Sequence, residues 1–165
     1  TGQESVSSST TAKNFTLDFN HPVKSLHWVV QDDDFSTTGS TGKNNQPLKY
    51  SADVTDSDTF STVKLQLNGH DRFSVQDADY FRLVQNVRHH KCSPRKHIYT
   101  YSFGLNPGEH QPSGTCNFSR IDNSVLQFTF NSTNHTAGSV TAHVYAVNYN
   151  VLRVMSGMGG LAYSN

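Results

Sequence analysis

The chain has 165 residues, which is enough for one domain with a sizeable hydrophobic core. Thirteen Lys and Arg residues balance thirteen Asp and Glu residues, so no global charge points to nucleic acid or to an acidic membrane surface. Charged residues make up only 16% of the sequence, and such a weakly charged surface favours association with copies of itself or with other proteins.

The N-terminal part of the chain changes from a polar segment to a β pattern. The first 13 residues are polar and rich in hydroxyl groups, which predicts a flexible arm or linker ahead of one domain over residues 14–165. NFTLDF alternates apolar and polar residues, as a half-buried strand does. VKSLHWVVQ predicts a second strand, whereas QDDDFSTTGSTGKNNQP lacks periodicity and predicts a long loop.

The rest of the chain continues the β pattern with one short helix. TVKLQLNG alternates and ends in an Asn-Gly turn signal, and DADYFRLVQ predicts the longest helix, within residues 76–86. KHIYTYSFGL, SVLQFTF and SVTAHVYAVNYNVLRVM predict further strands. This pattern favours an all-β sandwich or jelly roll with long loops and at most short helices. The side chains expected to point into the sandwich are Phe15, Leu17, Phe19, Val63, Leu65, Leu67, Phe128 and Phe130.

The closing segment from Met155 to Asn165 mixes apolar residues with glycines. A disposable tail would be polar, so this composition predicts a structural segment. Glycine allows close approach of the backbone, and we therefore expect the segment to fold back and lay Leu161 and Tyr163 onto its own domain or onto a partner.

The stretch EHQPSGTCNFSRIDN has the side chains of a nucleophilic site. His110 precedes Cys116 by six residues, but nothing in the sequence forces the two together. Two successive turn signals, NPG and QPSG, followed by a strand from Asn117 to Asn123, explain the stretch without catalysis. Such a strand would place Arg120 and Asp122 on one face, available to a neighbouring strand or subunit. We therefore predict no catalytic residue.

The stretch HHKCSPRKH is rich in metal-binding side chains and in positive charge. Structural zinc sites show spaced ligand pairs, which this stretch lacks, so no metal ligand is predicted. The basic run could contact phosphate, but pairing with an acidic loop of another subunit is favoured. His89, His90 and His97 would gain charge as the pH falls, so we expect assembly to respond between about pH 5 and 7. The residues expected at subunit contacts are Asp32, Asp33, Asp34, Arg88, His89, His90, Lys91, Arg95, Arg120 and Asp122.

Other functional signals are missing from the sequence. It has neither a P-loop, nor a dinucleotide fingerprint, nor a His-x-His pair, so no cofactor is predicted. No apolar run approaches the roughly 20 residues of a spanning helix. Free thiols at Cys92 and Cys116 are favoured, although pairing of the two stays open. The chain does not open with Met, which predicts a fragment or a processed product.

Four segments together resemble the second half of the major capsid protein of nucleocytoplasmic large DNA viruses. In chain order they are FNHPVKSLHWVVQ, LQLNGHDRFSVQDADYFRLVQ, IYTYSFGLNPGEHQPSGTCNFSRIDN and YAVNYNVLRVMSGMGGLAYSN. The resemblance runs from about Asn14 to Asn165. It implies a single eight-stranded antiparallel jelly roll, which is the C-terminal one of a two-jelly-roll subunit.

The resemblance also implies a structural function. The expected role is that of a subunit of an icosahedral capsid, forming trimeric pseudo-hexagonal capsomers in a virion assembled in the host cytoplasm. The implied partners are the N-terminal jelly roll of the same subunit, other copies in a homotrimer, neighbouring capsomers and minor capsid proteins, without direct nucleic acid contact or membrane insertion. The alternative is a lectin-like jelly roll that binds glycans through loops such as residues 32–47.

Overall fold

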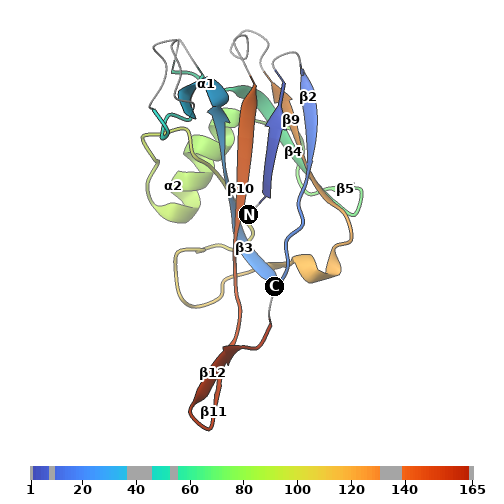
Figure 1. Ribbon diagram of the computed structural model, residues 1–165, viewed down its shortest axis with the longest axis vertical. Helices are drawn as coiled ribbons and strands as arrows, with labels where there is room; N and C mark the ends of the chain where they lie inside the picture. The colour runs from blue at the N-terminus through green and yellow to red at the C-terminus, as the bar shows by residue number, and fades with distance from the viewer. Residues whose placement is uncertain (1, 8–9, 37–45, 53–55, 131–138, 164–165) are drawn as a thin grey trace.

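The computed structural model of the chain describes all residues except 1, 8–9, 37–45, 53–55, 131–138 and 164–165. Two antiparallel sheets lie face to face, a helical segment covers one side, and a C-terminal hairpin projects from one end (Figure 1). The all-β antiparallel sandwich expected from the sequence is therefore confirmed. In the described part of the chain, no helix is both long and apolar enough to cross a membrane.

The first sheet is built around the long strand β3. In sheet order its strands are β1 (Gly2–Val6), β10 (Val140–Asn148), β3 (Pro22–Asp32) and β7 (Tyr99–Ser102), and β8 (Cys116–Asn117) also pairs with β3. Trp28 lies opposite Val144 of β10 on one side and Tyr99 of β7 on the other. VKSLHWVVQ thus forms a central strand with neighbours on both edges, which explains its density of β-branched and aromatic residues.

Strand β1 replaces the flexible arm that the composition of residues 1–13 had indicated. Gly2–Val6 pairs in register with β10, and Val6 is buried in the core. Ala12 and Lys13, also assigned to the arm, belong to the next strand. The prediction failed because backbone hydrogen bonds to the edge of β10 hold β1, and these do not depend on apolar side chains.

The second sheet faces the first across the core. Its strands, in sheet order, are β2 (Ala12–Thr16), β9 (Ser124–Phe130), β4 (Phe60–Leu67) and β5 (His70–Asp71), and β6 (Gln76–Asp77) also pairs with β4. Asn68 and Gly69 both have positive φ angles, as a tight hairpin turn requires, which confirms the Asn-Gly signal between β4 and β5.

The core between the sheets is rich in aromatic rings. Phe128 lies at its centre, with ring centroids 5.0 Å from Phe15, 5.1 Å from Phe60 and 6.4 Å from Trp28. Six of the eight side chains predicted to point inward are buried, and the other two, Phe19 and Leu67, are half-buried against the core. The alternation in the sequence therefore identified the inner face of the strands correctly.

A helical segment packs beside β7. The π-helical turn η1 (Tyr80–Val84) continues directly into α2 (Gln85–His90), which ends where Lys91 adopts a left-handed conformation. The prediction that the longest helix lies within residues 76–86 is wrong at its C-terminal end, because α2 extends to His90. Two further short helices are α1 (Asp33–Ser36) and the 3-10 turn η2 (Phe118–Arg120).

The C-terminal segment forms a separate hairpin instead of folding back. Strands β11 (Leu152–Met155) and β12 (Met158–Leu161) pair only with each other and extend away from the sandwich (Figure 1). Leu161 is 64% exposed and pairs only within the hairpin, so its expected packing on the chain's own domain is wrong, whereas Tyr163 is 60% exposed but its ring contacts His21. The alternative expectation, that the segment contacts a partner, stays a prediction.

Candidate functional site

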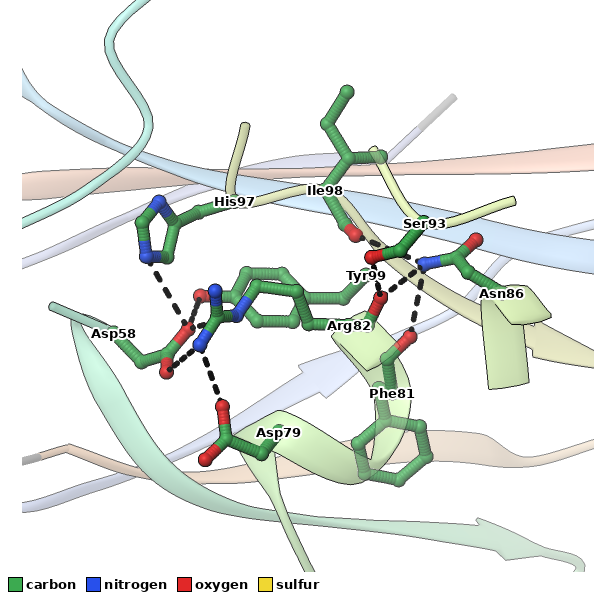
Figure 2. Close-up of polar contacts among 9 residues, drawn as sticks. All are labelled: Asp58, Asp79, Phe81, Arg82, Asn86, Ser93, His97, Ile98 and Tyr99. Carbon is green, nitrogen blue, oxygen red and sulfur yellow. Dashed lines mark hydrogen bonds and ion pairs between the residues drawn. The ribbon is translucent and has the colours of Figure 1, made fainter. Parts of the chain in front are cut away.

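A buried polar cluster holds the helical segment on the sandwich (Figure 2). Asp58, just ahead of β4, accepts a hydrogen bond from the hydroxyl group of Tyr99 on β7 and pairs with Arg82 of η1, with 3.2 Å between its Oδ1 and the Arg82 Nε. Arg82 also donates from Nη2 to Asp79 at 2.6 Å. One carboxylate therefore ties together three elements that are distant in the sequence.

The other members of the cluster are nearly enclosed. His97 lies with its Nε2 3.8 Å from Oδ1 of Asp58, and burial lowers the pKa of His97 although Asp58 opposes this effect. Burial, reinforced by Asp58, raises the pKa of Tyr99 above its ordinary value. Tyr99 thus stays protonated and donates a hydrogen bond to Asp58, which is a structural arrangement and not that of an acid–base pair.

The side-chain amide of Asn86 joins the helical segment to the following loop. Its Nδ2 donates to the backbone oxygens of Phe81, Arg82 and Ile98. A π-helical turn disturbs the regular pattern of backbone hydrogen bonds in a helix. The Asn86 amide therefore supplies a donor for the carbonyl groups of Phe81 and Arg82 in that turn. The cluster and Asn86 together fix the orientation of the outer face of the segment.

That outer face carries three exposed apolar side chains, which we call the helix stripe: Leu83, Val84 and Val87. They are 42%, 42% and 56% exposed. These side chains could not be picked out from the sequence, because the helical pattern is too short to separate a buried face from an exposed one. Residues 83 and 87 are one helical turn apart, and this spacing was the only signal that could have indicated the stripe.

Two of the predicted basic contact residues, Arg88 and Lys91, lie on or directly after α2, next to the helix stripe. Arg88, Lys91 and Arg95 are exposed, and Lys91 reaches Glu109 at 3.4 Å. His89 is half-buried, and its Nδ1 contacts the backbone oxygen of Leu105 at 2.9 Å. Arg88 and Lys91 therefore lie beside the helix stripe, whereas Arg95 borders a separate hollow with Leu48 and Tyr50.

The predicted acidic triplet is not an open patch. Asp32 is buried at the end of β3, and Asp33 accepts hydrogen bonds from Ser139 and Thr141 of its own chain. The side chain of Asp34 lies outside the described part of the structure. One of these carboxylates is thus buried, and another binds side chains of the chain's own strand β10 and the residue before it.

Arg120 and Asp122 do not share a strand face. The strand predicted from Asn117 to Asn123 is wrong: β8 ends at Asn117 and the chain turns into η2, where the Asn117 side chain accepts from the backbone N–H of Ser119. This cap favours a turn over an extended chain. Both charged side chains are exposed, but on a turn and a bend.

The structure gives the nucleophile hypothesis no support. Cys116 is half-buried in β8, and burial raises the pKa of its thiol, so the thiolate is disfavoured. His110 is exposed in the preceding loop, where Gly104 and Gly114 pack so closely that a Cβ on Gly104 would lie 2.8 Å from the Gly114 oxygen. Cys92 and Cys116 are free thiols. The described residues contain no group of three His, Cys, Asp or Glu side chains that could hold a metal ion.

Two histidines face each other between β3 and α2. The His27 ring lies 5.4 Å from the ring of His90, with its Nε2 3.0 Å from Ser25 Oγ and its Nδ1 3.2 Å from Thr100 Oγ1. Burial lowers the pKa of His27 from 6.5 to about 4, with a further contribution from His90. Burial also lowers the pKa of His90. Because burial also lowers the pKa of His97, the pH response expected of His90 and His97 moves to more acidic pH.

We expect acid to destabilise the fold through His27. Between pH 6.5 and about 4 the unfolded chain binds a proton at this site and the folded chain does not, so stability is full above pH 6.5 and falls as the pH is lowered. From pH 7 to 4.5 the wild type should lose about 2–3 kcal/mol more unfolding free energy than His27→Gln, as measured by urea denaturation. The exposed control His110→Gln should behave like the wild type. If His27→Gln and the wild type lost equal amounts of unfolding free energy between pH 7 and 4.5, His27 would not be the cause of the acid sensitivity.

The fold and its surfaces define a structural β-sandwich protein that presents contact faces. A family model described as "Large eukaryotic DNA virus major capsid protein" matches residues 1–160, so the chain belongs to this family. The family consists of structural components of virions and not of enzymes. The resemblance seen in the sequence is therefore confirmed, and with it the jelly-roll fold.

Individual relatives support the same assignment. The major capsid protein of Phaeocystis pouchetii virus is 39% identical, over 100% of this chain and 47% of that protein. That of Paramecium bursaria Chlorella virus 1 is 37% identical, again over 100% of this chain and 47% of that protein. A solved chain from the PBCV-1 virus capsid has a TM-score of 0.75 at 32% identity and covers 99% of this chain and 50% of that chain. The chain thus spans about half the length of these relatives.

Proposed function

We propose that this jelly roll is the C-terminal half of a capsid subunit, and that three subunits form a pseudo-hexagonal capsomer. The relatives are about twice as long as this chain, which leaves room for an N-terminal jelly roll of similar size in the same subunit. The further partners are other copies in the homotrimer, neighbouring capsomers and minor capsid proteins. Assembly takes place in the host cytoplasm, without direct nucleic acid contact or membrane insertion.

The observation that carries the proposal is the helix stripe on a rigid support. Exposed apolar side chains over a buried ion-pair cluster are typical of a surface that is covered in an assembly. Arg88 and Lys91 add positive charge beside this surface, which steers a neighbouring subunit and fixes its register more than it adds affinity. Arg120 and Asp122 are exposed and remain candidates for a second contact. The glycan-binding alternative relied on residues 32–47, of which 37–45 lie outside the described residues.

The mass of the full-length protein in solution tests this proposal. Light scattering should show a trimer, and Val87→Lys should weaken the trimer at least tenfold, because it buries an unpaired charge in the contact. Lysine suits the C-terminal part of a helix, so the fold should persist. Val75→Lys is a matched control, since Val75 is also 56% exposed but lies in the loop between β5 and β6. A monomeric wild-type protein, or equal effects of the two substitutions, would overturn the proposal.

A further inference from the structure

The C-terminal arm, residues 150–163, is a folded element and not a frayed end. Its two strands pair at four positions, and the turn residues Ser156 and Gly157 have φ angles of 51° and 79°, as a two-residue hairpin turn requires. At its base the N–H of Ala162 donates to Val151, and the Asn150 side chain donates to the oxygen of Tyr163, both at 2.7 Å. The arm thus has a defined shape before it meets any partner.

Both faces of the arm carry exposed apolar side chains, and Arg153 shares the second face with the two methionines. The cross-strand register places Leu152 and Leu161 together with Val154 on one face, and Met155 opposite Met158 on the other. These five side chains are between 55% and 75% exposed. An isolated two-stranded hairpin is at best marginally stable in water, so an arm of this kind is expected to be covered by a partner.

The exposed area of the arm matches that of a protein interface. Together with Tyr163, the five side chains leave roughly 700 Å² of accessible surface uncovered, compared with about 800 Å² contributed by each partner in a standard interface. Only one charged residue, Arg153, lies in the arm, so burial of the arm requires few charges to be desolvated. Because both faces carry exposed apolar side chains, the arm is suited to insertion between surfaces.

The connection to the sandwich directs the arm away from its own domain. Tyr149 donates its N–H to Pro22 at 2.9 Å, and the ammonium group of Lys24 lies 5.2 Å from the centre of the Tyr149 ring. His21 contacts the Tyr163 ring, with centroids 6.1 Å apart. These contacts fix both ends of the arm at the base of the sandwich, and the arm extends beyond it (Figure 1).

We propose that the arm inserts against the jelly roll of a neighbouring copy of the same chain. This inference rests on the proposed function, because a trimer supplies the second copy. An arm on one subunit and its receptor on the next form a head-to-tail contact, which closes into a ring when the rotation between copies allows it. The zero net charge of the chain means that copies do not repel each other strongly.

Photo-cross-linking in the purified full-length protein tests this assignment. Leu161→benzoylphenylalanine places the reactive group in the arm, and Leu48→benzoylphenylalanine is the control, since Leu48 is 60% exposed but lies on the body. After irradiation, denaturing electrophoresis separates the possible partners. A link to another copy doubles the subunit mass, whereas a link within one polypeptide leaves the mass unchanged.

We expect the arm position to give the doubled mass well above the level of the control. Material of single mass alone, or a yield of doubled mass no higher than that of the control, would show that the arm does not contact another copy; either result overturns the inference while leaving a trimer intact. A wild-type protein that does not assemble overturns the proposed function as well.

A polar version of the arm provides a second, independent readout. Leu152→Ser combined with Leu161→Ser should raise the dissociation constant of the assembled protein at least tenfold. Neither side chain belongs to the buried core, so the melting temperature of the dissociated protein should stay within about 2 °C of the wild type. Unchanged assembly in this variant would contradict the inference.

Discussion

Replacing Phe128 by alanine should lower the free energy of unfolding by about 3–5 kcal/mol, a large part of the ~5–15 kcal/mol that stabilises a domain. Phe128 is 1% exposed and contacts rings from both sheets: Phe15 and Phe60 belong to its own sheet, and Trp28 belongs to the opposite one. Removing its ring opens a cavity that the surrounding rigid rings cannot fill. Urea denaturation of the chain measures the effect directly.

Two further substitutions make the Phe128 prediction specific. Phe128→Leu keeps most of the buried volume and should cost clearly less than Phe128→Ala. Val75→Ala removes apolar atoms from a side chain that is already 56% exposed, and it should change the unfolding free energy by no more than about 0.5 kcal/mol. If Phe128→Ala cost less than 1 kcal/mol, the aromatic centre would not hold the two sheets together as the structure indicates.

The sequence predicted the features of the fold that depend on local periodicity. Alternation at Val63 and Leu65 reports which face of a strand is buried, because successive side chains point to opposite faces. The Asn-Gly pair after β4 reports a turn, because few other residues adopt positive φ angles easily. Both signals lie within a few residues and need no knowledge of distant partners.

Features that depend on distant contacts could not be predicted in this way. β1 is a polar strand held by its pairing with β10, nearly the whole chain length away. The helical segment extends to His90 because Asn86 and Arg82 are anchored by residues outside the segment, Ile98 and Asp58, which lie 12 and 24 residues away. The helix stripe is exposed for the same reason, since these anchors decide which face turns outward. The surface for subunit contact thus follows from tertiary structure more than from any motif.

Asp58→Ala should cost about 2–4 kcal/mol of unfolding free energy, the second-largest effect that we expect. The side chains of Asp58 and Arg82 are only 17% and 25% exposed. The substitution leaves the hydroxyl group of Tyr99 without its acceptor and the guanidinium group without its better-buried partner. A buried donor that loses its partner costs more than the lost bond itself contributes, because water does not replace the bond.

A double-mutant cycle with Asp79 as the matched control tests this argument. Asp79 also pairs with Arg82 but is 64% exposed, so Asp79→Ala should cost at most about 1 kcal/mol. Asp58→Ala with Arg82→Met should be less destabilised than the sum of the two single variants, because the double variant buries no unpaired charge. Equal costs for Asp58→Ala and Asp79→Ala would show that burial is not what makes the cluster important. Since Arg82 directly precedes Leu83 of the helix stripe, Asp58→Ala should also weaken assembly of the full-length protein, whereas Asp79→Ala should not.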